Sequence, residues 1–181
     1  NYYHPEYSVI PRIIVDNVYE LETLNKIAEK HGKVAGIMFR IKPGIDAHTH
    51  EFIMTGQIDS KFGFALETGE AMEAVRLAAG MKNVKLRGLH CHIGSQIFDI
   101  DPFELAAKVM MNFLGEIKAQ TGCVISELDL GGGFGIKYTE KDAPERFESY
   151  MEPVSAKIRE MAEEIGIPVP FVLIEPGRSI A

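Results

Sequence analysis

The sequence predicts an α/β fold, and within that class a partial (β/α)8 TIM barrel of about five C-terminal βα units. Three observations lead to this prediction. Short β-branched apolar runs alternate with segments that carry apolar residues at helical spacing, which is typical of a parallel sheet covered by helices. Polar and glycine-rich stretches follow three successive runs. The chain has 181 residues, whereas a complete barrel takes about 250.

The strands are predicted from apolar, β-branched runs that end in glycine or polar residues. In chain order they are residues 12–16, 34–44, 84–94, 125–133 and 169–177. The helices are predicted from a 3.6-residue apolar period, at residues 18–32, 65–80, 101–122 and 143–166.

Several residues mark where these helices should begin and end. Glycines close three of them: Gly32, Gly80 and Gly122. Asp101 is the expected N-cap of the third helix, with Pro102 as its first helical residue. Pro153 should kink or break the fourth helix, because proline cannot donate the hydrogen bond that a helix interior requires.

A doubly wound sheet is the competing architecture. We favour a barrel because "HCHIGSQ", "DLGGGFG" and "EPGRS" follow three consecutive strands, and a barrel spreads its active-site residues over several strand ends. Five strands cannot close a barrel of eight. We therefore expect residues 1–181 to be the C-terminal part of a barrel domain, with two open sheet edges that favour self-association.

Composition argues against several classes of function. The net charge is −7, so a nucleic-acid surface, which needs a basic stripe, is not expected. No apolar run reaches the roughly 20 residues that span a bilayer, so no membrane partner is expected. Cys91 and Cys123 lack a C-x-x-C spacing, which predicts two buried, reduced thiols in a cytosolic protein.

The stretch "DLGGGFG" places glycines directly after the fourth predicted strand. Consecutive glycines expose backbone N–H groups and let an anion approach closely. The spacing matches neither the G-x-G-x-x-G dinucleotide fingerprint nor a P-loop. Two interpretations stay open on these residues alone: a tight turn without a ligand, or an anion-binding loop formed by Gly131, Gly132, Gly133 and Gly135.

The stretch "GLHCHIGSQ" places His90 and His92 on one face of the third strand and Cys91 on the other. A histidine there can stack on a ring in a ligand site, and the turn at Gly94 and Ser95 can hold a phosphate. An H-x-H pair on a strand can also ligate zinc. Two hydrogen-bonded histidines in a polar barrel interior are the third interpretation.

A second H-x-H pair, His48 and His50, occurs in "DAHTHEF", where Asp46 and Glu51 could complete a metal site. We predict a solvated or interface loop there, and no metal, because the stretch is irregular and no cysteine is close by. Lys61, in "SKFGF", is predicted to be a surface lysine.

The last predicted strand ends in "LIEPGRS". Glu175 should point at whatever fills the barrel mouth, where a buried carboxylate needs a partner. Gly177 and Arg178 offer backbone donors to an anion, and Arg178 adds a guanidinium fork that suits phosphate or carboxylate. A carboxylate and an anion cup suggest a ligand with a cationic part and a phosphate. Pyridoxal 5'-phosphate has both.

In this order, "HIGSQ", "LDLGGGFG" and "EPGRS" resemble the decarboxylases of the alanine-racemase-like pyridoxal-phosphate fold. The stretch "DAHTHEFIMTGQIDSKFGF" is similar to diaminopimelate decarboxylases in particular, and the resemblance runs from about residue 13 to the end. It implies pyridoxal 5'-phosphate as cofactor and a homodimer when full length. The implied reaction is release of CO2 from the D-centre of meso-diaminopimelate, which gives L-lysine.

The resemblance also implies roles for individual residues. His92 would stack on the cofactor ring and Glu175 would pair with its pyridinium nitrogen, and these two are the implied catalytic residues. Arg178 would also meet a substrate carboxylate, and Lys61 would lie near the dimer interface. The implied phosphate contacts are Ser95, Gly131, Gly132, Gly133, Gly177 and Arg178.

The chain departs from the family pattern at two points. The Schiff-base lysine, expected in a Y-A-x-K-A type strand, is absent, and neither Lys42 nor Lys61 has that context. The C-terminal β domain of the family is absent as well. We therefore expect the isolated chain to be inactive. Two alternatives stay open: an ornithine, arginine or carboxynorspermidine decarboxylase of the same fold, and a non-catalytic homologue that binds a partner.

Overall fold

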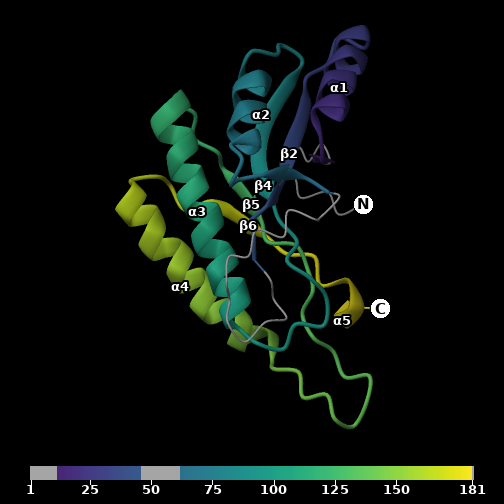
Figure 1. The fold of residues 1–181 in the computed structure, drawn as a ribbon, viewed down its shortest axis with the longest axis vertical. Coiled ribbons are helices and arrows are strands. Elements are labelled where there is room, and N and C mark those ends of the chain that lie inside the picture. Colours follow the sequence, from purple (N-terminus) through teal and green to yellow (C-terminus); the bar gives the residue numbers. More distant parts are fainter. Residues whose placement is uncertain (1–11, 46–61, 181) are drawn as a thin grey trace, which may run out of the picture.

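A computed structural model describes residues 12–45 and 62–180 of the chain. Its strands are β1 (Ile13–Val15), β2 (Ala35–Lys42), β3 (Phe64–Ala65), β4 (Val84–His90), β5 (Glu127–Asp129) and β6 (Phe171–Leu173). Its helices are α1 (Val18–Lys30), α2 (Glu70–Ala79), α3 (Asp101–Thr121), α4 (Phe147–Ile165) and α5 (Gly177–Ile180). Strands and helices alternate along the chain (Figure 1), which confirms the predicted α/β class.

The strands form one parallel sheet in the order β1-β2-β4-β5-β6, and β3 pairs with the carboxyl end of β2. The order follows the chain without the reversal that defines a doubly wound sheet, as expected for part of a barrel. β1 and β6 terminate this order, and each has one strand neighbour among the described residues. The predicted open edges are therefore present, whereas self-association stays a prediction.

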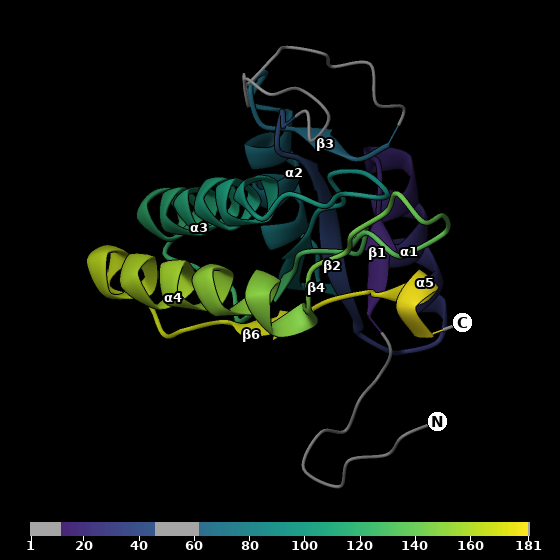
Figure 2. The same ribbon diagram turned by 90° about the horizontal axis from the view of Figure 1, so that it is seen from below.

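Helices α2, α3 and α4 lie along one side of the sheet, and α3 and α4 run side by side (Figures 1 and 2). Both turn an apolar face inward, so residues such as Met110 of α3 and Ile158 of α4 are buried. On the strand side, Phe39 of β2 and Leu89 of β4 are fully buried. Burial of these faces is the main force that holds helices to the sheet.

An aromatic cluster ties the loops at the carboxyl ends of the strands to the helices. Phe134, in the loop after β5, stacks on Phe103 of α3 with ring centroids 4.5 Å apart. Tyr150 of α4 meets the rings of both edge-on at 5.5 Å. The Tyr150 hydroxyl donates to the carbonyl oxygen of Phe98 at 3.0 Å. Two loops that follow neighbouring strands are thereby fixed against α3 and α4.

Several predicted boundaries are wrong. The second predicted helix begins five residues late, at Glu70, because Gly69 adopts a left-handed φ of +80°. Asp101 is the first residue of α3 and not its N-cap, because Ile100 already has helical angles. Helix α4 continues through Pro153 without a break. Strand β3 was not predicted, since two residues carry no recognisable pattern.

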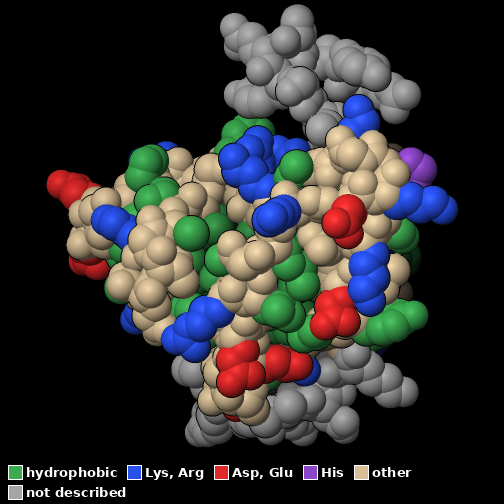
Figure 3. All heavy atoms as spheres, turned by 90° about the horizontal axis from the view of Figure 1, so that it is seen from above, with side chains coloured by type: hydrophobic (Ala, Val, Ile, Leu, Met, Phe, Trp, Pro, Cys, Tyr) green, Lys and Arg blue, Asp and Glu red, His purple; other side chains and the backbone are tan. Residues whose placement is uncertain are grey.

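The amino-terminal end of the sheet is seen in Figure 3, with hydrophobic side chains gathered between lysines, arginines and acids. Val34, Val124 and Val169, which precede β2, β5 and β6, are exposed. The described candidate site residues all follow the carboxyl ends of their strands instead. The candidate site and this apolar end are therefore on opposite ends of the sheet.

An ion pair joins strands that are not neighbours. Arg12, just before β1, donates from Nε and Nη2 to the two carboxylate oxygens of Glu127 of β5, both at 2.6 Å. Arg87 Nε of β4 lies 3.8 Å from the same carboxylate, whose side chain is 12% exposed. Hydrogen bonding by Glu127 raises the pKa of Arg12 above its ordinary value. The bidentate geometry makes this pair stronger than an ordinary surface pair.

We expect Glu127→Gln to lower the free energy of unfolding of the chain by about 2 kcal/mol, because two partly buried guanidinium groups lose their counter-charge. Urea denaturation followed by circular dichroism measures it. Glu148→Gln is the matched control, since its pair with Arg146 is exposed on both sides, and it should change stability by less than about 0.5 kcal/mol. Equal losses in the two variants would contradict the expectation.

Candidate functional site

Three polar stretches meet at the carboxyl end of the sheet because backbone hydrogen bonding continues past the strands. The Cys91 N–H donates to Asp129 O at 2.9 Å, and the Leu130 N–H donates to Leu173 O at 3.0 Å. One residue further, the Glu175 N–H donates to Gly131 O at 2.8 Å. The histidine, glycine and glutamate motifs therefore lie side by side, as the sequence predicts.

The glycine loop owes its composition to close backbone packing. A Cβ on Gly132 would collide with the carbonyl oxygen of Glu175, and one on Gly133 with that of Gly94. Gly131 faces the carbonyl of Cys91 in the same way and has a left-handed φ of +69°. Contacts within the protein thus account for all three glycines. The anion-binding interpretation of this loop stays a prediction.

A cavity of about 410 Å³ opens beside these motifs. His92 and Glu175, the two predicted catalytic residues, both line it. His90 also lines it, and Cys91 is buried in the hydrophobic core, so the predicted division of the strand into two faces is confirmed. The remaining lining residues are Ile14, Asp16, Glu20 and Arg40.

His90, Asp129 and Glu175 form a compact titratable cluster, whose ligand atoms all lie within 4.8 Å of one another. His90 Nε2 is 3.5 Å from Glu175 Oε2. Two carboxylates and an imidazole are ligand types that zinc accepts, and the same spacing suits a hydrogen-bonded network. His92 is not a member, so this cluster differs from the H-x-H pair that was one of the three interpretations of the strand. The absence of a metal stays a prediction.

Charges around the cavity set the protonation of His92. Removal of water by surrounding atoms lowers the pKa of His92 from its ordinary 6.5, and the nearby Arg40 and His90 lower it further. Glu175 acts in the opposite direction. The lowered pKa of His92 favours the neutral imidazole. A neutral ring is suited to lie against another aromatic ring without a charge to desolvate.

None of the six predicted phosphate contacts lines the cavity. Ser95 is partly buried and follows Gly94, whose carbonyl oxygen lies against Gly133. The Gly177 N–H donates to Glu175 O at 2.8 Å. Arg178 is exposed on α5. The structure therefore brings together the two predicted ring contacts, and the convergence of the phosphate contacts on one anion stays a prediction.

Sequence reasoning missed Arg40, Asp16 and Asp129. Arg40 Nε lies 4.0 Å from an Asp16 carboxylate oxygen, and its guanidinium lies 4.9 Å from the Phe62 ring centroid. A charged residue inside the apolar run "IMFRI" was the available signal for Arg40, because such a run is otherwise core. The same reasoning applies to Asp129 in "LDLGGG". His48, His50, and Lys61 lie outside the described residues.

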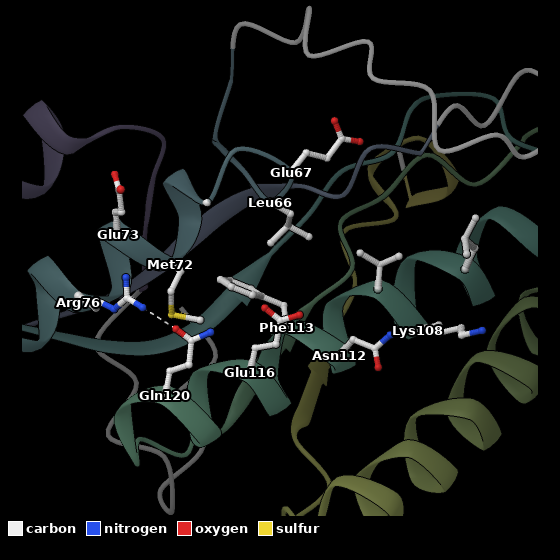
Figure 4. A pocket seen from close by; sticks show the side chains of 13 residues that line it. Leu66, Glu67, Met72, Glu73, Arg76, Lys108, Asn112, Phe113, Glu116 and Gln120 are labelled. Carbon is white, nitrogen blue, oxygen red and sulfur yellow. Dashed lines mark hydrogen bonds between the residues drawn. The ribbon is translucent and has the colours of Figure 1, made fainter.

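A second groove, of about 640 Å³, lies between α2 and α3 (Figure 4). Met72 and Phe113 point into it, while Glu73 and Lys108 lie at its margin. Arg76 of α2 donates to Gln120 of α3 at 2.6 Å across one end. None of its lining residues belongs to the motifs above. The groove is larger than the cavity, yet it lacks the convergent buried polar groups that mark a site.

Burial raises the pKa of the Asp129 carboxyl above its ordinary 3.8. The hydrogen bond from the Gly131 N–H lowers this pKa, the charge of Glu175 raises it further, and His90 lowers it. A raised pKa means that the folded state binds the proton more tightly than the unfolded state. The contribution of protonated Asp129 to the stability of the folded state is complete below pH 3.8. It is lost as the pH rises through the folded-state pKa of Asp129.

We therefore expect Asp129→Asn, which keeps an acceptor for the Gly131 N–H, to gain stability relative to the wild type as the pH rises from 3.8 toward 7. Urea denaturation of both proteins across this range measures the difference. A difference that stays flat, or falls, with pH would show that Asp129 is not held in a costly charged state.

No helix in the described part of the chain is long and apolar enough to cross a membrane. The two cysteines are free. Cys91 is buried as predicted, whereas the prediction of a buried thiol is wrong for Cys123, which is exposed. Burial raises the pKa of the Cys91 thiol to about 12. Cys91 is accordingly a core residue and not a nucleophile.

Residues 6–181 match the family model described as pyridoxal-dependent decarboxylase, pyridoxal binding domain. Diaminopimelate decarboxylase of Corynebacterium efficiens is 46% identical over 169 residues, which are 93% of this chain and 37% of that protein. That of Bacillus subtilis is 44% identical and covers 93% of this chain and 38% of its own length.

Solved structures agree with the sequence relatives. Diaminopimelate decarboxylase from M. jannaschii in co-complex with L-lysine superposes with a TM-score of 0.82 at 36% identity, covering 92% of this chain and 38% of that one. The chain thus spans a little over a third of the length of these relatives, and the predicted barrel-type fold is confirmed. It belongs to the pyridoxal-dependent decarboxylases and matches their pyridoxal binding domain.

Proposed function

We propose that this chain is part of a pyridoxal-5'-phosphate-dependent diaminopimelate decarboxylase, a carboxy-lyase that converts meso-2,6-diaminopimelate to L-lysine and CO2 in lysine biosynthesis. One observation carries the proposal: His92 and Glu175, which come from separate strand ends, line the same cavity. The similar relatives described above support the choice of substrate. The chain would contribute the C-terminal part of the cofactor-binding barrel.

The residues present suit this cofactor. His90 Nδ1 is buried without a hydrogen-bond partner in the described structure, which marks a polar environment built for more than packing. Glu175 would keep the ring nitrogen protonated, and neutral His92 would cover one face of the ring. When bound, the cofactor supplies an electron sink for the electron pair released as CO2 leaves. Ser95, the loop Gly131–Gly133, and Gly177 with Arg178 would hold the phosphate.

The experiment is a substrate comparison in the full-length protein, meaning a protein of the relatives' length that contains these residues. CO2 release is measured with pyridoxal 5'-phosphate and, in turn, meso-diaminopimelate, ornithine, arginine and carboxynorspermidine. A kcat/KM highest for meso-diaminopimelate supports the proposal. Preference for another substrate would replace it with a sister decarboxylase, and cofactor binding without turnover of any substrate would favour a non-catalytic homologue.

The isolated 181-residue chain is expected to be inactive, because it contains no Y-A-x-K-A type lysine to anchor the cofactor. The measurement is CO2 release from meso-diaminopimelate with added pyridoxal 5'-phosphate, compared with free cofactor alone. Turnover above that background would contradict the expectation. Lys42, at the carboxyl end of β2, would then be the first lysine to replace.

We also propose that the full-length protein is a cytoplasmic homodimer. Two free cysteines suit a reducing compartment.

A further inference from the structure

Among the residues that the structure describes, His90 and Asp129 are the only buried side chains of the Asp, Glu, His, Lys or Arg types, at 4% and 5% exposure. They lie directly opposite each other in the β4–β5 pair. Burial of such groups costs free energy unless hydrogen bonds or an opposite charge compensate for the lost water. The proposed contacts to the cofactor employ neither of them, so their burial calls for a separate explanation.

The imidazole of His90 has a defined orientation. Nδ1 is buried and has no hydrogen-bond partner in the described part of the chain, while Nε2 faces Glu175 Oε2 at 3.5 Å. Burying Nδ1 as an unpaired acceptor costs less free energy than burying it as an unpaired N–H donor, because in the second case the Glu175 carboxylate beside Nε2 would also lack a donor. An N–H on Nε2 faces the glutamate, whereas an N–H on Nδ1 would be buried without an acceptor among the described residues.

Asp129 is linked to Glu175 by two hydrogen bonds through the backbone of Gly131. Its Oδ1 accepts the Gly131 N–H at 2.8 Å. The carbonyl oxygen of Gly131 in turn accepts the Glu175 N–H at 2.8 Å. The main chain of Glu175 is therefore fixed by a glycine that Asp129 itself holds. Its side chain faces His90 Nε2 at 3.5 Å.

We propose that His90 and Asp129 are positioning residues that keep the Glu175 carboxylate aimed into the cavity. The inference rests on the proposed function, in which Glu175 faces the ring nitrogen of pyridoxal 5'-phosphate. The Glu175 side chain is 50% exposed, so without His90 it is free to turn toward water. A carboxylate has two oxygens and can accept from His90 and from a ring N–H together.

The test uses the full-length protein with bound pyridoxal 5'-phosphate, titrated with base while the cofactor absorbance is recorded. His90→Leu removes the donor at similar volume, and His90→Gln keeps an N–H donor near the position of Nε2. We expect the pH at which the ring nitrogen loses its proton to fall by about one unit in His90→Leu and to recover in His90→Gln. Under the same conditions kcat should fall about tenfold, with KM little changed.

Cys91→Ala is the matched control, because Cys91 neighbours His90 on the chain but is buried in the core and does not line the cavity. It should leave the titration unmoved. Asp129→Asn should shift the titration in the same direction as His90→Leu, by a smaller amount, since the amide still accepts the Gly131 N–H. A titration that His90→Leu leaves in place, or that Cys91→Ala shifts equally, overturns the proposal.

Glu175→Gln separates this proposal from the proposed function. If Glu175→Gln leaves the cofactor titration unchanged, Glu175 does not face the ring nitrogen and the proposed function fails at that residue. If Glu175→Gln shifts it, His90→Leu should add nothing in that background, because both act on one carboxylate. Additive shifts would overturn the positioning role alone. Should His90→Leu not fold, His90→Asn, whose shorter side chain stops before Glu175, takes its place against His90→Gln.

Discussion

Replacement of Glu175 by glutamine in the full-length protein should lower kcat about a hundredfold or more, which corresponds to about 2.7 kcal/mol of transition-state stabilisation. Glutamine keeps the size of the side chain but removes the charge that, in the proposed function, would keep the ring nitrogen protonated. An unprotonated ring accepts negative charge poorly, and that deficit grows as CO2 leaves. The loss therefore belongs to the transition state and not to binding.

Cofactor affinity should change much less in this variant, because none of the proposed phosphate contacts is touched. Steady-state kinetics with a parallel titration of pyridoxal 5'-phosphate separates the two effects. Glu67→Gln is a suitable control, since Glu67 lines the groove between α2 and α3 and lies outside the cavity. A kcat within a few-fold of wild type, combined with loss of the cofactor, would make Glu175 a structural residue.

Gly132→Ala should lower the free energy of unfolding by about 3 kcal/mol, because the new Cβ would meet the Glu175 carbonyl oxygen in a backbone that cannot retreat. The Glu175 N–H is already bonded to Gly131 O, so the two loops are held at this separation. The melting temperature should fall by roughly 10 °C. Differential scanning calorimetry of the chain measures both quantities.

Gly80→Ala is the control for loss of glycine itself. Gly80 has right-handed helical angles, and a Cβ there meets only the Leu77 carbonyl at an ordinary 3.5 Å. Its stability should stay within about 0.5 kcal/mol of wild type. If Gly132→Ala is equally mild, the two loops are more pliant than the structure shows.

The same contact changes how the glycine loop can be tested as an anion site. Any side chain at position 132, valine included, would displace Glu175 even if no anion ever bound there. Loss of cofactor in such a variant would therefore not identify a phosphate contact. Ser95→Ala and Arg178→Met are cleaner variants, because neither residue is packed against the backbone of a neighbouring motif in the contacts that the structure gives.

The sequence was sufficient for the alternation of strands and helices, because each element carries its own apolar period and most are closed by a glycine. The ends of the strands were predicted too far along the chain. β4, β5 and β6 stop at His90, Asp129 and Leu173, and the chain is irregular beyond these residues. Apolar and glycine residues continue past these points, so composition does not reveal where regular pairing ends.

Site residues could be predicted from the sequence where they lie in a recognisable polar motif. They could not be predicted where only burial in the folded protein sets them apart. His92 and Glu175 were found because each sits in a polar stretch after an apolar run. Asp129 was missed, and His90 was named only beside His92, because depth and cross-strand register alone show that His90 and Asp129 form a buried pair. Neither property is encoded locally, because both depend on which strands become neighbours.

The ion pair between Arg12 and Glu127 has a kinetic meaning. Its partners are 115 residues apart, so forming it early would require closing a very long loop before other contacts compensate the lost entropy. The pair can therefore strengthen the molecule only after the intervening strands are in place. An interaction made that late leaves the folding rate almost untouched and slows unfolding instead, so it lengthens the lifetime of the native state.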